Sequence, residues 1–361
     1  MKAVLLTGHG GLDKLEYRED VPQPRPASGE VLVRVRACGL NNTDINTRTA
    51  WYSGAVESGI TEDAVISGYE GSRDNDASWG SQSLTFPRIQ GADICGHVEA
   101  VGDEVDGTII GKRVMVDPWV LNAHNPMDMT QARYIGSELD GGYAQYAVIP
   151  MSNIHVVDST YSDVELATFA CAYGTADNLI ERTGLTAGET VVVSGASGGV
   201  GSAAIQLAKM RGARVVAISS VAKAGALMGL GADHVVDRNN PDLTNAVKAL
   251  VGEVDVAVDV VGGDTFPALV DCLRQGGRYS SSGCISGPLV EFDLRKLIYR
   301  DLQMTGATII PPGSFARLVG YIESGALKPL VAKSWPLHEL ADAQTAFMKK
   351  DHIGKLVVTI P

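Results

Sequence analysis

TVVVSGASGGVGSAAIQLAKMRGARVVAIS, residues 190–219, decides the fold of this chain. Residues 190–193 are β-branched throughout, which favours a buried strand of a parallel sheet. Apolar residues then recur with helical spacing from 200 to 208, and a second β-branched run follows at 214–218. Between the first strand and the helix, three glycines stand three residues apart: Gly195, Gly198 and Gly201. A strand, a glycine turn, a helix and a strand in this order predict the opening of a doubly wound α/β domain.

The glycine loop has the chemistry of a phosphate site. Without side chains the backbone approaches a pyrophosphate closely, and the helix that follows presents free N–H groups and a partial positive charge. A loop that only packs its helix tightly onto the sheet would also use glycine, but the two flanking strands favour a dinucleotide. The residues expected to contact it are Gly195, Ala196, Ser197, Gly198, Gly199 and Val200.

Composition narrows the function. The 361 residues allow two domains, and 42 acidic against 30 basic residues give a net charge of −12, which argues against nucleic acid or an anionic membrane surface as partner. The apolar run at residues 3–6 is too short for a signal peptide and is expected to form the first strand. The five cysteines are widely spaced and form no CxxC pair, so we expect reduced thiols in a cytoplasmic protein.

The pattern along the chain changes twice. Residues 1–157 show short alternating strands separated by Pro and Gly, which predicts an antiparallel, partly closed β domain. Residues 158–310 alternate strands and helices, the pattern of a parallel sheet. In the tail, 311–361, a helix is followed by a strand at 355–360 that we expect to return to the first domain's sheet. The Gly/Ser/Asp-rich insertion at 52–87 is either a functional lid or an ordinary surface loop.

With these segments assembled, the chain resembles the medium-chain dehydrogenase/reductases, which include the zinc alcohol dehydrogenases and the quinone oxidoreductases. The likeness covers nearly the whole chain. It implies a GroES-like β domain built from both chain ends, a Rossmann domain between them, and a substrate site where they meet. It is carried by the glycine loop together with residues 29–35, 39–44, 91–96, 140–144 and 354–357.

The sequence departs from the zinc-dependent members of this family. By resemblance, their catalytic metal is held at four positions, which are here Asn41, Ala92, Asp93 and Cys171. Zinc needs about three protein ligands, and asparagine and alanine are poor or useless ones. Residues 117–140 also lack the cysteines of a structural zinc site. We therefore expect no zinc and a packing role for Cys171, although ligands from elsewhere, Cys95, His97 or His124, would rescue a site.

Without a metal, the favoured chemistry is reduction of an activated alkene or a quinone. Hydride transfer to such a substrate places negative charge on an enolate or a phenolate, which hydrogen-bond donors can hold. Alcohol oxidation or carbonyl reduction, normally helped by a Lewis acid, is the second hypothesis. A non-catalytic NADPH-binding redox sensor is the third.

Donors to the substrate are expected in the first motif. Thr43 matches the hydroxyl residue that contacts substrate oxygen in the alcohol dehydrogenases, and Asn41 stands at the lost cysteine position. Both are also ordinary turn formers. The aromatic residues expected to line the substrate pocket, with plain core packing as the alternative, are Trp51, Tyr52 and Tyr143.

The cofactor is predicted to be NADPH. NAD-binding domains place an acid about 20 residues beyond the glycine turn, where it binds the ribose 2′-hydroxyl. No Asp or Glu occurs from Thr190 to Ala232, and the second strand ends instead in Ser219 and Ser220, with Lys223 close behind. Two hydroxyls and an ammonium suit a 2′-phosphate.

The resemblance implies further cofactor contacts and an assembly. It places Thr175 near the nicotinamide and Lys355 on the phosphate side, and it predicts a homodimer or a homotetramer acting on a small molecule. The remaining expected contacts are Val261, Gly262, Ser282, Gly283 and Cys284.

Overall fold

The computed structural model describes residues 1–69, 83–128 and 130–361, which form two compact units. The β unit contains residues 1–56, 60–171 and 311–361, and the α/β unit contains 57–59 and 172–310. The first boundary thus falls at 171/172, later than the predicted 157/158. The reason is that helix α3 (Asp163–Leu166) packs on strands β3 and β5 of the β unit.

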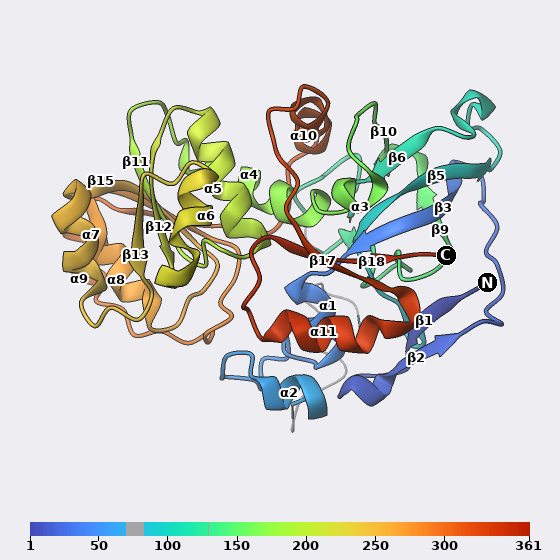
Figure 1. Cartoon of the computed structure of the whole chain (residues 1–361), viewed down its shortest axis with the longest axis horizontal. Coiled ribbons are helices and arrows are strands. Elements are labelled where there is room, and N and C mark those ends of the chain that lie inside the picture. The colour runs from blue at the N-terminus through green and yellow to red at the C-terminus, as the bar shows by residue number, and fades with distance from the viewer. Residues whose placement is uncertain (70–82, 129) are drawn as a thin grey trace. The chain divides into compact units, whose positions relative to one another are not determined.

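The α/β unit is a six-stranded, all-parallel sheet in the order β13-β12-β11-β14-β15-β16 (Figure 1). The order reverses between β11 and β14, so the predicted doubly wound fold is confirmed. The strands are β11 (Thr190–Val193), β12 (Arg214–Ser219), β13 (His234–Asp237), β14 (Val254–Asp259), β15 (Leu273–Ser281) and β16 (Gln303–Gly306).

Helices connect these strands. Apolar faces bury Leu207 of α5 and Leu269 of α8, because a helix on a sheet must hide one stripe of its surface. Figure 1 shows α7, α8 and α9 grouped at the left of the sheet. The helices are α4 (Ala170–Thr183), α5 (Gly199–Met210), α6 (Ala224–Gly229), α7 (Leu243–Val251), α8 (Thr265–Cys272) and α9 (Leu294–Tyr299).

The β unit is built on a seven-stranded sheet, β10-β6-β5-β3-β18-β17, with β9 also paired to β3. Strand β18 lies between β3, which it meets antiparallel, and β17, so the prediction that the tail returns to this sheet is confirmed. The strands are β3 (Glu30–Gly39), β5 (Asp93–Val101), β6 (Arg113–Val116), β9 (Tyr146–Pro150), β10 (Ile154–Val156), β17 (Val331–Pro336) and β18 (Lys355–Thr359).

Smaller sheets and helices complete the β unit. A three-stranded sheet contains β2 (Leu15–Arg18), β1 (Ala3–Leu6) and β4 (Arg88–Ile89), and a two-stranded one contains β7 (Trp119–Val120) and β8 (Arg133–Tyr134). The helices are α1 (Asn42–Arg48), α2 (Glu62–Ser67), α10 (Ser314–Glu323) and α11 (Leu340–Met348).

The insertion predicted at 52–87 contains helix α2, which begins where the Thr61 hydroxyl accepts a hydrogen bond from the Ala64 N–H at 3.1 Å. Residues 70–82 of this insertion lie outside the described residues. Arg48 at the end of α1 is fully buried, and its guanidinium donates to the carbonyls of Gly10 and Val65, which ties α2 to α1.

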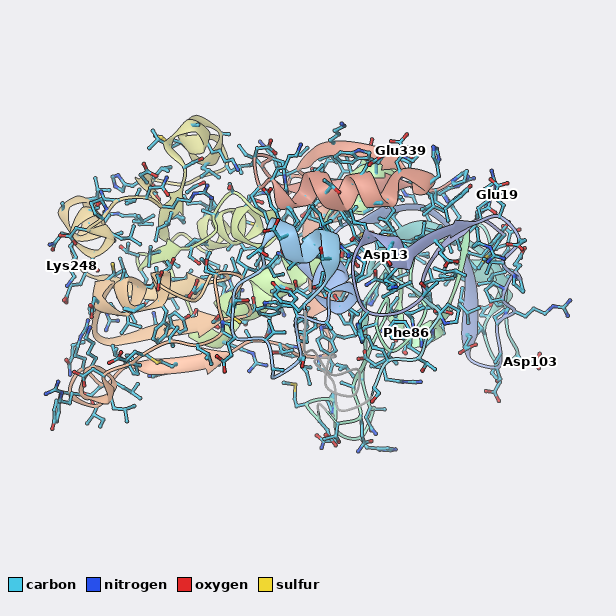
Figure 2. All side chains as sticks on the ribbon, turned by 90° about the horizontal axis from the view of Figure 1, so that it is seen from below. Asp13, Glu19, Phe86, Asp103, Lys248 and Glu339 are labelled. Carbon is cyan, nitrogen blue, oxygen red and sulfur yellow. The ribbon has the colours of Figure 1, made fainter. Side chains whose placement is uncertain are left out.

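Most charged side chains lie at the surface, because burying a charge costs free energy unless it is paired. Figure 2 shows Glu19, Asp103 and Lys248 at the periphery of the chain. Among the described residues, no helix combines the length and the apolar character needed to span a bilayer.

Glycine is needed at two positions of the loop for different physical reasons. Gly195 has a φ of +56°, a conformation that favours glycine. A Cβ atom on Gly201 would lie 2.3 Å from the Gly195 carbonyl oxygen, so Gly201 allows α5 to pack closely on this turn. Gly198 lacks both constraints, since its φ is −75° and the nearest atom to an added Cβ is 3.5 Å away. The loop therefore serves close packing as well as the phosphate site.

The Gly201→Ala variant is expected to lose about 1–3 kcal/mol of unfolding free energy, because the added methyl group collides with backbone that cannot move independently. Urea denaturation followed by circular dichroism measures the loss. The matched control is Gly198→Ala, which should change stability by less than about 1 kcal/mol. Equal effects of the two substitutions would contradict the packing explanation.

Candidate active site

The cofactor edge is the name used here for the carboxyl ends of β11, β12, β14 and β15 with the loops that follow them. Parallel strands end at the same side of a sheet, so loops far apart in sequence meet there. Backbone hydrogen bonds connect them: the Ala196 N–H donates to the Ile218 carbonyl at 3.2 Å, and the Ser286 N–H to the Val261 carbonyl at 2.9 Å. The predicted residues that this edge brings together are those of 195–200, Ser219, Ser220, Lys223, Val261, Gly262, Ser282, Gly283 and Cys284.

The start of α5 fits a phosphate. The first hydrogen bond of the helix joins the Ser202 N–H to the Gly198 carbonyl at 2.9 Å, so the helix itself makes no use of the N–H groups of residues 199–201. An ammonium is close, since Lys223 donates to the Ser197 hydroxyl at 3.3 Å. Free N–H groups, a helix N-terminus and a cation together suit a dinucleotide pyrophosphate.

Strand register reveals two residues that the sequence analysis missed. Asp237, the last residue of β13, lies opposite Ser219 of β12, and the Arg238 N–H donates to the Ser219 carbonyl at 2.9 Å. The Asp237 carboxylate accepts the Asn239 N–H at 3.1 Å and so serves its own turn. The Arg238 side chain is exposed, and its guanidinium makes no hydrogen bond or ion pair within the described part of the chain. Asp237 and Arg238 could have been identified only from the register of β12 and β13, which cannot be derived from the sequence.

A second group of polar residues lies in the β unit around the Lys355 ammonium, and we call it the polar cluster. Lys355 and Asp93 are 3% and 0% exposed, and their charged atoms are 2.8 Å apart. The ammonium also donates to the side-chain oxygen of Asn41 and to the Leu40 carbonyl, at 2.5 Å each. The other Asp93 oxygen accepts the Cys171 N–H at 2.6 Å. Three of the four family zinc positions are thus together, around a cation that the chain itself supplies.

Lys355, expected on the phosphate side of the cofactor, has its ammonium buried against Asp93 inside the β unit. Its contact with the cofactor stays a prediction. Moving the Lys355 ammonium away would leave the Asp93 carboxylate buried without a counter-charge, and this cost holds the ammonium where it lies. Asn41 is likewise committed, because its oxygen accepts from Lys355 and its N–H donates to Asp44 at 2.8 Å.

Tyr143 is fully buried and its hydroxyl donates to the Asp44 carboxylate at 2.8 Å, so it supports the turn before α1. These contacts agree with the packing alternative for Tyr143, and its place in a substrate pocket stays a prediction. Burial raises the pKa of Asp44 to about 6, against the opposing effects of hydrogen bonds from the Asn41 N–H and Tyr143.

Thr43, Trp51 and Tyr52 lie together on α1 and the turn after it. The rings of Trp51 and Tyr52 meet edge to face, with centroids 5.7 Å apart. Burial raises the pKa of the Tyr52 phenol to about 12, although the neighbouring polar side chains of Thr43 and Asn46 lower it. The phenol therefore stays protonated as a donor. Thr175 is half-buried on α4, in the α/β unit.

The donor set does not fit a catalytic zinc. The oxygens of Asn41 and Asp93 face the Lys355 ammonium, and Ala92 has no donor atom. Burial, with the Asp93 charge, raises the pKa of the Cys171 thiol to about 11, which disfavours the thiolate that zinc binds. The alternative ligand Cys95 lies against the Asp163 carboxylate, at 3.7 Å. Within residues 1–69, 83–128 and 130–361 no three His, Cys, Asp or Glu side chains are placed to hold a metal.

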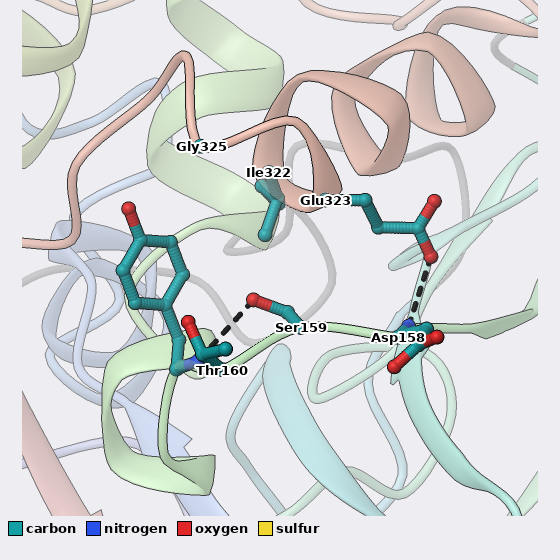
Figure 3. Close-up of a pocket in the computed structure, with 7 residues that line it drawn as sticks. Asp158, Ser159, Thr160, Ile322, Glu323 and Gly325 are labelled. Carbon is teal, nitrogen blue, oxygen red and sulfur yellow. Dashed lines mark hydrogen bonds between the residues drawn. The ribbon is translucent and has the colours of Figure 1, made fainter.

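A surface pocket of about 260 Å³ lies elsewhere in the β unit, between residues 158–161 and the end of α10 (Figure 3). Its floor is fixed by the Asp158 N–H, which donates to Glu323 at 2.9 Å. None of the predicted site residues lines it, so it is separate from both groups described above.

A dinucleotide-type α/β unit joined to a β unit defines a two-domain dehydrogenase, and comparison with known proteins agrees. Residues 27–159 match the family described as alcohol dehydrogenase GroES-like domain, and residues 199–324 match the one described as zinc-binding dehydrogenase. The crystal structure of a putative alcohol dehydrogenase from Sinorhizobium meliloti 1021 is 47% identical, with a TM-score of 0.88 over 100% of this chain and 97% of that one.

Two curated relatives differ in their names. The NAD-dependent alcohol dehydrogenase of Sulfurisphaera tokodaii is 27% identical over 99% of each chain. The acryloyl-coenzyme A reductase of Metallosphaera sedula is 27% identical over 99% of this chain and 100% of its own. The chain therefore belongs to the medium-chain dehydrogenase/reductase superfamily of oxidoreductases, and the resemblance seen in its sequence is confirmed.

The Lys355→Met variant is expected to lose about 3–5 kcal/mol of unfolding free energy, because it leaves the Asp93 carboxylate buried without a counter-charge. Adding Asp93→Asn should restore a large part of this loss, and chemical denaturation of single and double variants measures the coupling. The control pair is Lys209 and Asp233, 3.0 Å apart and 36% exposed on each side, where Lys209→Met should cost less than about 1 kcal/mol. Additive losses at Lys355 and Asp93 would contradict the buried ion pair.

Proposed function

We propose that this oxidoreductase is a zinc-independent, NADPH-dependent reductase of activated alkenes or quinones. The observation that carries the proposal is the Lys355 ammonium, which faces both the Asp93 carboxylate and the Asn41 side-chain oxygen. A cation already present between two of the expected ligands opposes a divalent metal there, by charge and by occupied lone pairs.

The reaction class follows from what the remaining groups can do. Bound NADPH supplies a hydride. The hydroxyls of Thr43 and Tyr52 are neutral hydrogen-bond donors, and a buried phenol with a pKa near 12 stays protonated at physiological pH. Such donors suit the delocalised charge of an enolate or a phenolate better than the localised charge of an alkoxide, for which a Lewis acid is the usual partner. The relative named acryloyl-coenzyme A reductase supports an activated alkene.

The choice of NADPH rests on the end of β12. Ser219, Ser220 and Lys223 offer two hydroxyls and an ammonium, and Arg238 adds a guanidinium beside them. An acid opposite Ser219, Asp237, would favour NADH over NADPH, but its carboxylate already accepts the Asn239 N–H. A small-molecule substrate, a homodimer or homotetramer and a cytoplasmic location belong to the same proposal.

Alcohol oxidation or carbonyl reduction is the competing function, favoured by the names of two similar proteins. It would use the same Thr43 hydroxyl, so the site alone does not separate the two. The substrate panel below does, because enones and quinones test the proposed reductase, whereas ketones with reduced cofactor and alcohols with oxidised cofactor test the competing function.

The deciding experiment incubates the purified protein, prepared without chelator, with NADPH and with NADH against small enones, quinones and ketones, and with NADP⁺ and NAD⁺ against alcohols, following absorbance at the nicotinamide band. We expect NADPH consumption with enones or quinones, unchanged by chelator, and less than one zinc per chain by elemental analysis. Zinc-dependent turnover of an alcohol or ketone alone would refute the proposal. NADPH binding without consumption across the panel would favour the redox sensor.

The Arg238→Ala variant is expected to weaken NADPH binding about tenfold and to leave NADH binding within about twofold, because it removes one charge-assisted contact to the 2′-phosphate. Fluorescence titration with both nucleotides measures the difference. Arg295→Ala is the control, since this exposed arginine pairs only with Asp293 of its own helix start. Equal losses for NADPH and NADH would contradict a 2′-phosphate contact.

A further inference from the structure

One buried carboxylate joins three segments of the cofactor edge. Asp259 ends β14 and is 0% exposed. Its oxygens accept hydrogen bonds from the Ser194 hydroxyl after β11 and from the Tyr279 hydroxyl of β15, the latter at 2.7 Å. They also accept the N–H groups of Val261 and Gly262 in its own loop, at 2.8 and 3.2 Å.

The donors come from three neighbouring strands. Ser194 directly precedes the glycine turn, and its hydroxyl accepts the Val260 N–H at 3.0 Å, so this hydroxyl links both loops at once. Tyr279 lies in β15, two residues before that strand ends and the segment of Ser282 to Cys284 begins. The Ser282 N–H, in turn, donates to the Asp259 carbonyl at 3.3 Å.

Packing leaves these loops little room to shift separately. A Cβ on Gly195 would lie 2.9 Å from a methyl group of Val260, and a Cβ on Gly262 would lie 2.8 Å from the Cys284 Cβ. Gly262 has a φ of +63°, which its N–H bonds to Asp259 help to hold. The segments expected under the cofactor are therefore positioned as one body around Asp259.

We propose that Asp259 is a positioning residue for the dinucleotide: by binding Ser194, Tyr279 and the Val261 and Gly262 N–H groups, it sets the glycine turn and the loop after β14 in the geometry that receives the cofactor. This inference rests on the proposed function, since it concerns the same NADPH site. Asp259 itself is fully buried and touches no solvent, so it acts through the loops that it holds.

The Asp259→Asn substitution preserves shape but replaces one acceptor oxygen by an NH₂ donor, which must then face donors of the loop or of Ser194. Such a mismatch of buried donors costs enough to open the loop. The matched control is Asp255→Asn, at the other end of the same strand, where the carboxylate accepts the Thr190 N–H at 2.7 Å and pairs with Arg274. Both variants lose a buried or half-buried carboxylate, but only one lies at the cofactor edge.

The test measures NADPH binding by fluorescence, binding of adenosine 2′,5′-bisphosphate by calorimetry, and the KM values for NADPH and for a reducible enone. We expect Asp259→Asn to weaken NADPH about tenfold or more, to change binding of the bisphosphate less than about threefold, and to raise the KM for NADPH but not that for the enone. Asp255→Asn should leave all four within about twofold.

Two further variants keep the proposal falsifiable if Asp259→Asn does not fold. Ser194→Ala and Tyr279→Phe each remove one donor, and both should weaken NADPH by a smaller factor in the same pattern. Equal weakening by the Asp259 and Asp255 variants, or unchanged NADPH binding by the Asp259, Ser194 and Tyr279 variants, would overturn the proposal. Failure of the unaltered protein to bind or use NADPH would refute the proposed function instead. If the unaltered protein uses NADH, the same variants are compared with NADH and 5′-AMP in place of NADPH and the bisphosphate.

Discussion

The buried pair of Lys355 and Asp93 is the constraint on which the β unit depends. Moving an ammonium and a carboxylate out of water costs several kcal/mol per ion, so each charge must find the other before the sheet can close. The pair joins the start of β18 to the start of β5, which are separated by most of the chain. The Lys355 ammonium fixes the position of the Asn41 side chain by a hydrogen bond. Asp93 fixes the first turn of α4 by accepting the Cys171 N–H.

The α/β unit solves a similar problem without a counter-ion. Asp259 has no cation among its hydrogen-bond partners, and hydroxyl and backbone donors from three strands surround it. An ion pair fixes two points, whereas a carboxylate with several neutral donors fixes a whole edge of a sheet. The two buried acids therefore have different roles: Asp93 holds the turn before α1 through Lys355 and Asn41, and Asp259 joins the loops at the carboxyl ends of β11, β14 and β15.

Local pattern predicted most of the fold. Alternation and helical spacing depend on neighbours in sequence, so the strand expected at 190–193 and the helix expected at 200–208 appear as β11 and α5. The return of β18 to the first sheet was also foreseen. The sequence failed where partners lie far apart: Tyr143 meets Asp44 and Lys355 meets Asp93, and no periodicity states such pairs. Residues 190–232 contain no acid, but Asp237 lies opposite Ser219, because strand register, not sequence distance, decides which residue lies beside it.

The place of β18 inside its sheet has a consequence for biosynthesis. Residues 172–310 of the α/β unit are synthesised before β17 and β18, and at about 5–20 residues per second the delay until β18 is made lasts several seconds. During that interval the end of β3 presents unpaired backbone where β18 will add. The α/β unit can therefore fold before β18, an interior strand of the β unit, has been made. Until then, the unpaired end of β3 is the part of the nascent chain that most needs a chaperone to cover it.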